Sequence, residues 1–494
     1  MILRSNTVST AAAILAVTSS GSCQSTTRTI NVPTATPSSV SQNIDPSFPG
    51  FAFEQSSFYN YSFNAQGKPN VFSQNLVNAV LSRTGGTPLL RVGGTSGDAG
   101  NFSSSQNEAT NFPATKYGPQ FKGGLTISPS YFEAFKNWPG AKFEFMVPFH
   151  NTSRSHSLKW AEAGMNHIGT DNLYTLEIGN EPNFYSWFNV PEYVKRYRTL
   201  QKNLINKIPA LNDKKIFQAL DTAANHAKEL TAKASFEQGL NDITASIKQV
   251  GFHYYQGHGP KTFSELQDWV RHSLTVENMS NFTPNIRYLQ NKHPYIGFAF
   301  TETGYNVGSG GGELGNNLAT ALWAVDFQLY CMTVNVTRIN WQQILASSLN
   351  MWRGVESKAG PARVSPNFYS QPFIADFIGK GGKTSVAPLD VGGDGDGKLV
   401  AYAAYESGKL ARIALLNLDL WTSDNGTRPH VKVNHLSAPN GALAEAGLTY
   451  AGLEWTLESN GTENQVKNDS NVLEVGDTGV TVSVNATSAV MVVL

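Results

Sequence analysis

The chain has 494 residues, of which 40% are hydrophobic, 11% aromatic and 15% charged. Lysine plus arginine and aspartate plus glutamate both number 37, so the formal net charge is zero. A chain of this length is too long for one compact core, so we expect two domains. A neutral chain without a basic cluster has no overall attraction to DNA, RNA or an anionic membrane, and we expect neither a nucleic-acid nor a membrane partner.

The first 24 residues have the pattern of a secretory signal peptide. Arg4 provides a positive start, residues 10–17 form a short apolar core, and small residues follow. This pattern predicts removal between Ser20 and Ser25 and a secreted, extracellular protein. A buried N-terminal helix is the alternative interpretation. No other run approaches the roughly 18 apolar residues of a membrane span.

Cysteines are few and sequons are many. Cys23 would leave with the signal peptide or lie at its edge, and Cys331 lies in an apolar helical stretch. We therefore expect a buried thiol at Cys331, with no disulfide framework and no cysteine-based metal site. In a secreted protein, Asn-x-Ser/Thr sequons are acceptors for N-glycans. The predicted glycosylation sites are Asn60, Asn101, Asn151, Asn278, Asn281, Asn335, Asn425, Asn460, Asn468 and Asn485.

Strand-like and helix-like runs alternate from about residue 50 to 345, and their order predicts a (β/α)8 barrel over residues 45–370. Helical spacing is found at residues 72–83, 128–137, 157–167 and from Pro191 onward. A doubly wound open sheet is the alternative, but it usually has a glycine-rich loop after its first strand, and GFAFEQSSF has none. The strand-like runs are GFAFE (50–54), TPLLRVGG (87–94), KFEFMVPF (142–149), LYTLEIGN (173–180), KIFQAL (215–220), QVGFHYY (249–255), YIGFAFTE (295–302) and RINWQQI (338–344).

The composition changes after about residue 370. KLVAYAA (398–404) and KLARIALLN (409–417) are alternating strands joined by ESG, which predicts a hairpin. Short strands separated by Gly, Asn and Ser turns continue to the end of the chain, so we expect an all-β sandwich over residues 371–494. RTINV (28–32) is also strand-like, and we expect the segment 25–44 to join this sandwich.

In a (β/α)8 barrel, polar side chains at the carboxyl ends of the strands face the active site. Glu181 directly follows the strand-like run LYTLEIGN, and Glu302 ends YIGFAFTE with the same apolar approach. Two carboxyls that face one another across a barrel mouth are the minimum needed for glycoside hydrolysis. A glutamate at a strand end is more often a solvated loop residue or an ion-pair partner, and Glu54 could simply pair with Arg91. The other strand ends supply Thr95, His150, Asn180, His253, Tyr254, Tyr255, Gln342 and Gln343.

The motif GNEP (179–182), with FTETG (300–304) about 120 residues further on, resembles the clan of retaining (β/α)8 glycosidases. LLRVGGTSGD (89–98), GFHYYQG (251–257) and the glycine-rich tract after Glu302 resemble glycoside hydrolase family 79, the β-glucuronidase and heparanase family. The barrel, and a C-terminal sandwich that takes in an N-terminal strand, are also the architecture that this resemblance implies.

Carried over by motif, the resemblance implies that Glu181 is the acid/base and Glu302 the nucleophile. Asn180 would contact the sugar 2-hydroxyl, and Glu54 would bind O3 or O4. Further residues would line the subsite that holds the cleaved sugar or bind its carboxylate through backbone amides in the glycine-rich tract, where the sequence departs from the usual tyrosine followed by paired glycines. These residues are Thr95, His253, Tyr255, Tyr305, Gly310, Gly311 and Gln343.

The sequence thus predicts a secreted, monomeric, retaining exo-β-glucuronidase that acts on carbohydrate substrates and needs no metal or organic cofactor, and it leaves open whether a 4-O-methyl group on the glucuronic acid is tolerated. An endo-acting heparanase-like enzyme is an alternative, although the chain lacks the basic clusters that long sulfated chains require. The motifs are also compatible with another clan glycosidase, such as an arabinofuranosidase-like enzyme, and with a non-catalytic glycan-binding protein. Loss of either glutamate would favour the binding protein, and both are present.

Overall fold

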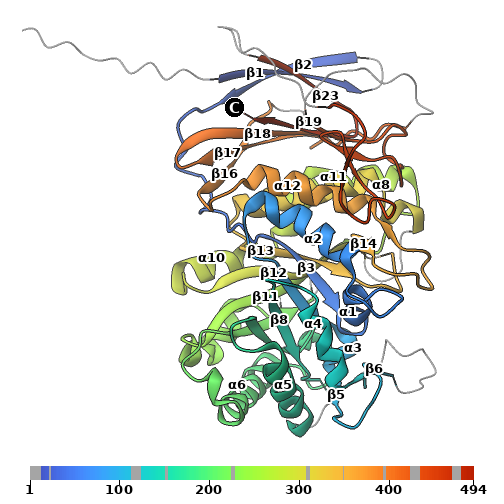
Figure 1. The fold of residues 1–494 in the computed structure, drawn as a ribbon. Coiled ribbons are helices and arrows are strands. Elements are labelled where there is room, and N and C mark those ends of the chain that lie inside the picture. Colours follow the sequence, from blue (N-terminus) through green and yellow to red (C-terminus); the bar gives the residue numbers. More distant parts are fainter. Residues whose placement is uncertain are drawn as a thin grey trace, which may run out of the picture.

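A computed structural model of the chain describes residues 13–21, 24–112, 124–150, 154–223, 229–306, 312–348, 350–392, 397–422, 434–469 and 480–493. A barrel of parallel strands lies below two stacked β-sheets, with a layer of helices between the barrel and the sheets (Figure 1). The predicted fold class, a (β/α)8 barrel with a C-terminal all-β domain, is confirmed.

Eight parallel strands close the barrel in the order β10-β11-β12-β13-β3-β4-β8-β9. All eight strand-like runs of the sequence are barrel strands, and nearly all of their side chains are buried, as both faces of a parallel sheet are covered. The strands are β3 (Pro49–Glu54), β4 (Leu89–Gly93), β8 (Lys142–Val147), β9 (Leu173–Ile178), β10 (Phe217–Thr222), β11 (Ile247–Gly257), β12 (Gly297–Asn306) and β13 (Arg338–Gln343).

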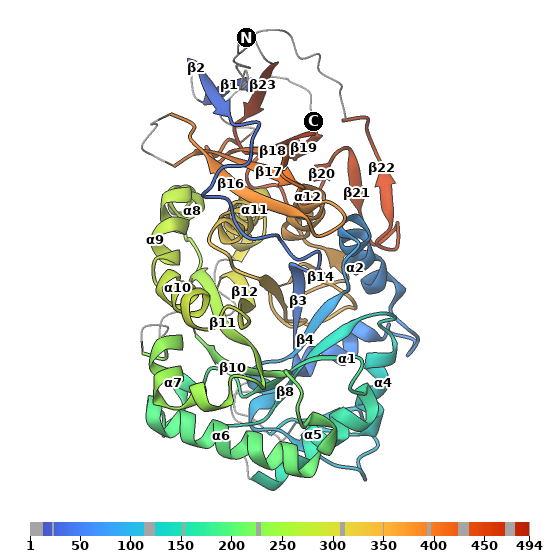
Figure 2. The same cartoon turned by 90° about the vertical axis from the view of Figure 1, so that its left-hand side faces the viewer.

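Helices surround the barrel, and the turned view shows them around the lower half of the molecule (Figure 2). Three of the longest begin at an asparagine whose side chain accepts a hydrogen bond from the first turn, namely Asn70, Asn189 and Asn317. The main helices are α1 (Gln55–Ser62), α2 (Val71–Thr84), α5 (Arg154–Ile168), α6 (Val190–Lys207), α7 (Ala232–Gln238), α8 (Phe263–Val270), α9 (His272–Met279), α10 (Thr283–Lys292), α11 (Leu318–Thr333) and α12 (Ser370–Ile378). Within the described ranges, no helix combines the length and apolar character needed to cross a bilayer.

The C-terminal part is an eight-stranded sheet in the order β16-β17-β18-β24-β19-β20-β21-β22. The hairpin expected around ESG is present, with Glu406 opposite Lys409 and left-handed backbone at Ser407 and Gly408. The strands are β16 (Thr384–Leu389), β17 (Leu399–Glu406), β18 (Lys409–Asn417), β19 (Asn434–Ser437), β20 (Thr449–Tyr450), β21 (Leu453–Trp455), β22 (Glu463–Gln465) and β24 (Ser488–Val493).

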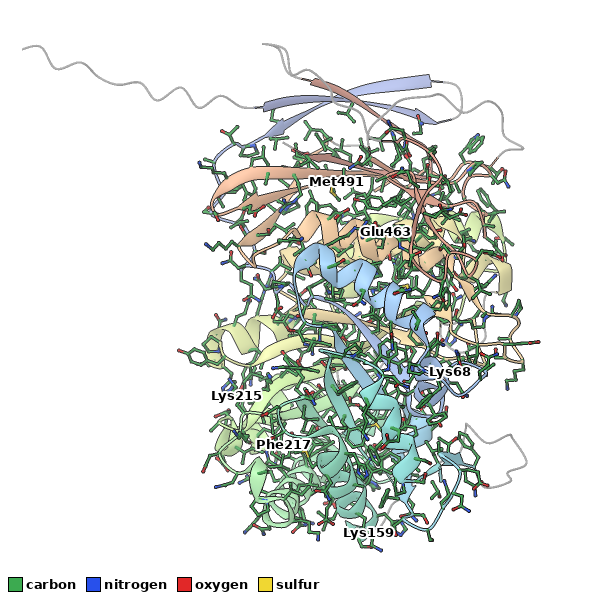
Figure 3. The ribbon with its side chains drawn as sticks, in the orientation of Figure 1. Lys68, Lys159, Lys215, Phe217, Glu463 and Met491 are labelled. Atoms are coloured by element: carbon green, nitrogen blue, oxygen red, sulfur yellow. The ribbon has the colours of Figure 1, made fainter. Side chains whose placement is uncertain are left out.

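The sheet has apolar side chains on both faces. One face packs on α11 and α12, through residues such as Tyr402 and Met491, and Figure 3 marks Met491 in this layer. The other face packs, through Leu415 and its neighbours, on Ile30 and Val32 of β2 (Gln24–Val32) and on β23 (Val480–Asn485). The N-terminal strand therefore does join the C-terminal domain.

Two of the predicted domain limits can be compared with the elements of the structure. The boundary after residue 370 falls at the start of α12, which packs against α2 and α11 on the barrel side of the junction. Residues 13–21, assigned to the signal peptide, form β1 (Ala13–Gly21), which lies between β2 and β23 in a three-stranded sheet. This structure contains the uncleaved chain, so removal of the signal peptide stays a prediction.

Candidate active site

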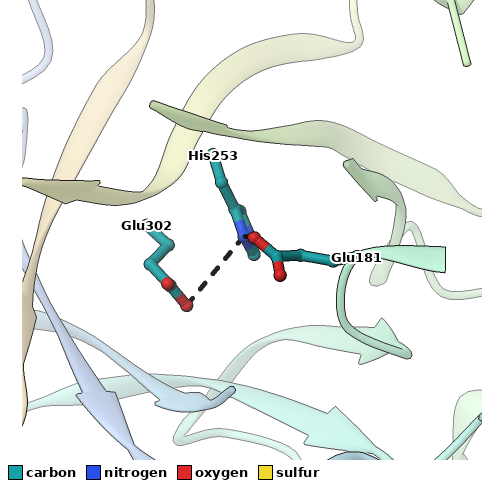
Figure 4. A group of neighbouring side chains, drawn as sticks. All are labelled: Glu181, His253 and Glu302. Carbon is teal, nitrogen blue, oxygen red and sulfur yellow. Dashed lines mark hydrogen bonds and ion pairs between the residues drawn. The ribbon is translucent and has the colours of Figure 1, made fainter. Parts of the chain in front are cut away.

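Glu181 and Glu302 face one another at the carboxyl ends of β9 and β12, with His253 of β11 between them (Figure 4). One carboxylate oxygen of each glutamate and one ring nitrogen of the histidine all lie within 4.8 Å of one another. Retaining glycosidases place their two carboxyls about 5 to 5.5 Å apart, whereas inverting enzymes leave about 6.5 to 9.5 Å for a water molecule. The observed spacing is that of a retaining pair.

Glu181 has a left-handed backbone conformation, with φ at 50° and ψ at 54°. Such a conformation is costly for a residue with a side chain and persists only where neighbouring contacts impose it. Here the Glu181 N–H donates to the Asp221 carbonyl at 2.8 Å, and the Glu181 carbonyl accepts from the Phe184 N–H at 2.9 Å. The preceding Gly179 is also left-handed, and a Cβ there would lie 2.7 Å from Phe149. The GNEP turn is therefore held in a shape that aims the carboxyl across the barrel mouth.

Glu302 is buried and is held by two charge-assisted hydrogen bonds. The Tyr255 hydroxyl donates to Oε1 at 2.6 Å, and the Arg91 guanidinium donates to Oε2 at 2.6 Å. Burial raises the pKa of this carboxyl, but His253, Arg91 and Tyr255 together outweigh burial and lower the pKa below its ordinary value. An ionised carboxylate that is fixed in position and points toward the barrel mouth is suited to act as a nucleophile.

Arg91 is fully buried and links several groups below the site. Besides Glu302, its guanidinium donates to both carboxylate oxygens of Glu177, at 2.6 and 2.9 Å, and to the Asn180 side-chain oxygen at 2.8 Å. Several neighbouring carboxylates keep the pKa of Arg91 well above its ordinary value despite burial. The expectation that Arg91 could pair with Glu54 is wrong, because Arg91 is committed to these other partners.

The side chain of Asn180 has a defined orientation. Its oxygen accepts from Arg91, so its NH2 group points the other way and lies 3.4 Å from the Thr95 hydroxyl. Its backbone N–H donates to the Tyr185 hydroxyl at 3.1 Å, and that hydroxyl donates to the buried carboxyl of Asp98. Burial raises the pKa of Asp98 to about 7. Asn180 can therefore offer an N–H donor, rather than an acceptor, to a bound sugar.

Glu54 ends β3, two strands away from Glu302 in the barrel order. Its Oε1 accepts from the Ser96 N–H at 2.8 Å and the Ser96 hydroxyl at 2.6 Å, and its Oε2 lies 3.4 Å from the Gln342 amide nitrogen. Burial, followed by repulsion from Glu302, raises the pKa of Glu54 to about 7, against the lowering effect of Ser96 and Arg91. A Cβ on Gly94 would lie 2.2 Å from Oε2, so this carboxyl requires glycine beside it.

His253 contacts both glutamates. Its Nδ1 lies 3.1 Å from Glu181 Oε1 and 3.9 Å from Glu302 Oε2, and its ring is fully buried. The two carboxylate oxygens of Glu302 already have donors in Arg91 and Tyr255. The guanidinium on Glu302 also supplies a positive charge where a divalent cation would have to sit, so this donor set does not favour a metal site.

Two predicted sugar contacts, Tyr305 and Gln343, are not supported by the placement of their side chains. The Tyr305 ring is 2% exposed and packs between Trp269 and Trp323, so it faces the helices and not the barrel mouth. Gln343 donates to the Trp341 carbonyl and accepts from the Met351 N–H, which ties it to its own loop. Gly310 and Gly311 lie outside the described residues. The neighbouring Gln342 takes the place that was assigned to Gln343.

The sequons differ in exposure. Asn60, Asn460 and Asn468 are exposed. Asn485 is 6% exposed in β23, so a glycan there is incompatible with this fold. The prediction that Asn485 is glycosylated is therefore wrong. Asn151 and Asn425 lie outside the described residues, and glycosylation at the remaining positions stays a prediction. Cys331 is buried and free, as expected.

Several residues at the site were not assigned a role from the sequence, namely Glu177, Ser96, Gln342, Asp98 and Tyr185. One signal was present for the first. Charged residues in the middle of apolar strands, Arg91 in LLRVG and Glu177 in LYTLEI, are unusual and indicate a buried ion pair. Gln342 and Ser96 lie at strand ends, which gave their place but no role, whereas nothing in the sequence around Asp98 and Tyr185 indicated that they support the site.

Sequence comparisons with known proteins find relatives that are glycoside hydrolases. Residues 401–491 match the glycosyl hydrolase family 79 C-terminal β domain. A β-glucuronidase of Aspergillus niger is 26% identical over 502 residues, which cover 91% of each chain. A β-glucuronidase of Neurospora crassa is 24% identical and covers 85% of this chain and 86% of that one. The chain is thus similar to glycoside hydrolase family 79 over its C-terminal domain and to these β-glucuronidases over most of its length.

Solved structures agree on the fold. A 4-O-α-L-rhamnosyl-β-D-glucuronidase of Fusarium oxysporum superposes with a TM-score of 0.75 at 18% identity, covering 94% of this chain and all of that one. A family-51 arabinofuranosidase of Xanthomonas axonopodis gives 0.60 at 14% identity, covering 97% and 99%. These structures show that the chain has the fold of known glycosidases. Together with the β-glucuronidase relatives and the matched C-terminal domain, the chain is a glycoside hydrolase, and retention is a property of the family that it resembles.

Proposed function

We propose that this protein is a secreted, exo-acting β-glucuronidase that cleaves its substrate with retention of configuration. The observation that carries the proposal is the pair Glu181 and Glu302, whose carboxylate oxygens lie within 4.8 Å across the barrel mouth while Arg91 and Tyr255 hold Glu302. The two β-glucuronidase relatives, which align over most of the chain, support glucuronic acid as the sugar.

In the first half of the reaction Glu302 attacks the anomeric carbon. The bond from that carbon to the aglycone oxygen breaks, and Glu181 gives its proton to the departing oxygen. Tyr255 and Arg91 keep Glu302 ionised and aimed until the covalent bond forms. The Asn180 NH2 group, turned away from Arg91, donates to the sugar 2-hydroxyl, a contact that strengthens as charge develops on the ring.

In the second half a water molecule takes the place of the aglycone. Glu181, now a carboxylate, removes a proton from that water as it attacks the anomeric carbon, and Glu302 leaves as a carboxylate. His253 Nδ1 lies 3.1 Å from Glu181 Oε1 and helps to hold that carboxyl in position during this step. Neither step uses a metal or an organic cofactor, because the two carboxyls supply nucleophile, acid and base.

Glu54 and Gln342 are proposed to bind the ring hydroxyls on the side away from the aglycone. Glu54 Oε1 is fully used by Ser96, but its Oε2 has only the long 3.4 Å contact to Gln342. The Gln342 oxygen is buried and has no partner among the described residues. These two oxygens are therefore available to accept hydrogen bonds from sugar hydroxyls, and pairing them would remove the cost of leaving them unpaired.

The proposals of exo action and of secretion are supported by features of the sequence. The chain has no basic cluster of the kind that endo cleavage of a long sulfated glycan needs, and its first 24 residues have a leader pattern. If the leader is removed, the N-terminal sequence of protein recovered from culture medium begins between residues 21 and 26. A mature protein that still begins at Met1 would contradict this part of the proposal.

The activity is tested by hydrolysis of p-nitrophenyl β-glucuronide beside the β-glucoside, the β-galactoside and the α-arabinofuranoside. Wild type is compared with Glu302→Gln and with the matched surface variant Glu237→Gln, whose side chain is 51% exposed. The proposal expects glucuronide cleavage by wild type and Glu237→Gln, and a loss of several orders of magnitude in Glu302→Gln. Product stereochemistry is followed by proton NMR, where the β-anomer must appear first.

Each other outcome has a defined meaning. Cleavage of only a neutral glycoside keeps the two-carboxylate mechanism and contradicts the glucuronide assignment. First appearance of the α-anomer contradicts retention. If no glycoside and no glucuronic acid polymer is cleaved while glycans still bind, the chain is a binding protein.

A further inference from the structure

Phe184 is an exposed aromatic side chain three residues after Glu181. Its side chain is 54% exposed, and among the described residues only one other aromatic side chain, Tyr295 at 84%, is exposed to a similar degree. Single exposed apolar residues are common on protein surfaces, so exposure by itself carries no argument. Phe184 is of interest because of its position relative to the acid/base residue.

The turn that carries Phe184 is firmly held. Pro182, Asn183 and Tyr185 on either side of it are buried. The Asn183 side-chain oxygen accepts from the Thr222 hydroxyl at 2.7 Å and the Ala223 N–H at 3.0 Å. The exposure of Phe184 therefore does not come from a frayed loop, because the turn that carries it is held on both sides.

The same turn keeps Phe184 close to the acid/base. The Phe184 N–H donates to the Glu181 carbonyl at 2.9 Å, and residues joined in this i to i+3 manner have Cα atoms within about 7 Å. Glu181 must touch the glycosidic oxygen to protonate it, so the aglycone lies on the Glu181 side of the bond being cleaved. A rigid aromatic residue on that side offers an apolar surface on which a ring can stack.

We propose that Phe184 is the stacking platform of the aglycone subsite and selects substrates in which the glycosidic oxygen joins glucuronic acid to a ring with an apolar face. A sugar ring and an aryl ring share this chemistry. The inference rests on the proposed role of Glu181 as acid/base, and it goes beyond that role by naming the aglycone class and the residue that binds it.

The test compares Phe184→Ala with wild type on three glucuronides. Two carry a ring directly on the glycosidic oxygen, p-nitrophenyl β-glucuronide and a β-glucuronosyl-galactose disaccharide, and the third is methyl β-glucuronide, which has no ring. Tyr295→Ala is the matched control, because Tyr295 precedes β12 and its carbonyl accepts from Lys215, at the amino ends of the barrel strands. Figure 3 marks Lys215 on the side of the barrel opposite Lys68, which lies in a loop at the carboxyl ends.

We expect Phe184→Ala to lower kcat/KM on the ring aglycones about 2- to 12-fold, mostly through KM, and to leave methyl glucuronide unchanged. Phe184→Trp retains the ring and should restore activity, whereas Phe184→Leu should not. A loss on only one ring substrate supports the proposal and identifies that ring as the aglycone class. Tyr295→Ala should change none of the three.

Two results would overturn the inference. An equal loss on all three substrates means that Phe184 supports the Glu181 turn and not the aglycone, and no loss on any means that it binds nothing. Failure of the proposed function is distinguished from failure of this inference by the activity of the wild type alone. If wild type cleaves a neutral glycoside in place of glucuronides, the same series is run on the neutral aryl, disaccharide and methyl glycosides, since the argument depends on the acid alone. A wild type that cleaves no glycoside contradicts both.

Discussion

Replacing Tyr255 with phenylalanine should raise the pKa of the nucleophile by a predictable amount. The Tyr255 hydroxyl donates to Glu302 Oε1 at 2.6 Å in a buried setting, and no second donor to that oxygen is seen among the described residues. Phenylalanine removes the donor and leaves the ring. The ionised form of Glu302 then loses one of the interactions that keep its pKa below the ordinary value.

The magnitude follows from the strength of a hydrogen bond to a charged group, about 1.5 to 3 kcal/mol. Because one pKa unit corresponds to about 1.4 kcal/mol, the pKa of Glu302 should rise by about 1 to 2 units. The sign is upward, since the donor stabilises the carboxylate and not the acid. Arg91 still holds Oε2, so Glu302 stays in place.

The assay is the pH profile of kcat/KM on p-nitrophenyl β-glucuronide, whose acid limb reports ionisation of the nucleophile in the free enzyme. The limb should move about 1 to 2 units to higher pH in Tyr255→Phe. Tyr254→Phe is the control, because Tyr254 is the adjacent residue and its hydroxyl donates to Gln256, away from the site. An unshifted limb in Tyr255→Phe, or an equal shift in both variants, would refute the assignment of Tyr255 as the donor that tunes Glu302.

Other predictions concern the surroundings of the two glutamates. Tyr185→Phe leaves the buried N–H of Asn180 without its acceptor and should cost about 1 to 3 kcal/mol in urea unfolding; an unchanged midpoint would show that this bond contributes nothing. Gln342→Ala should lower kcat/KM on the glucuronide about 2- to 12-fold, the worth of one hydrogen bond, while the unfolding midpoint changes little, and full activity would remove Gln342 from the site. Gly94→Ala places a Cβ 2.2 Å from Glu54 Oε2 at a φ of 100°, so both activity and stability should fall, the latter by about 1 to 3 kcal/mol; a fully stable and active variant would contradict the described backbone.

Much of the fold could be predicted because the barrel strands are short apolar runs with abrupt polar ends. GFAFE, LYTLEIGN and YIGFAFTE are buried on both faces, which gives them continuous hydrophobic character and makes them visible without an alignment. The polar residue that ends each run then falls at the catalytic end of the barrel by the geometry of the fold. Glu181 and Glu302 could be paired from the sequence for this reason alone.

The partners of Arg91 could not be predicted in the same way. Glu177 lies in β9 and Arg91 in β4, and β8 separates the two strands in the barrel. Their side chains meet because inward-pointing residues of alternate strands form layers inside a barrel, and the layer of a residue depends on strand register. A sequence shows which residues alternate along a strand, but not how far one strand is shifted against another.

Register explains one of the two misplaced side chains. β12 carries an extra residue between Phe300 and Thr303 relative to both of its neighbours, β11 and β13. This irregularity changes which residues of β12 face the interior beyond it, because side chains alternate with period two, and Tyr305 consequently turns toward the helices. The pairing of β13 with β3 is regular, so Gln342 follows Arg338 and Asn340 on the inner face by simple alternation, and Gln343 does not.

The buried charges below the site have a physical cost that the structure offsets locally. Burying Arg91 and Glu177 removes both charges from water. The desolvation free energy is offset only where the ion-pair geometry is good and the remaining donors have acceptors. Here the guanidinium makes four hydrogen bonds, to Glu177, Glu302 and Asn180. The network fixes the nucleophile and the Asn180 amide together, so the same residues that carry the desolvation cost also orient the groups that bind and attack the sugar.

The central claim is that Glu302 forms a covalent bond with the sugar, and trapping that bond tests it most directly. Wild-type enzyme is incubated with 2-deoxy-2-fluoro-β-glucuronyl fluoride, which forms the intermediate quickly and releases it slowly, and is then digested and examined by mass spectrometry. The account predicts one fluoroglucuronyl group on the peptide that contains Glu302, and none when Glu302 is glutamine. A label on Glu181 or Glu54, or complete inactivation without a label, would contradict it.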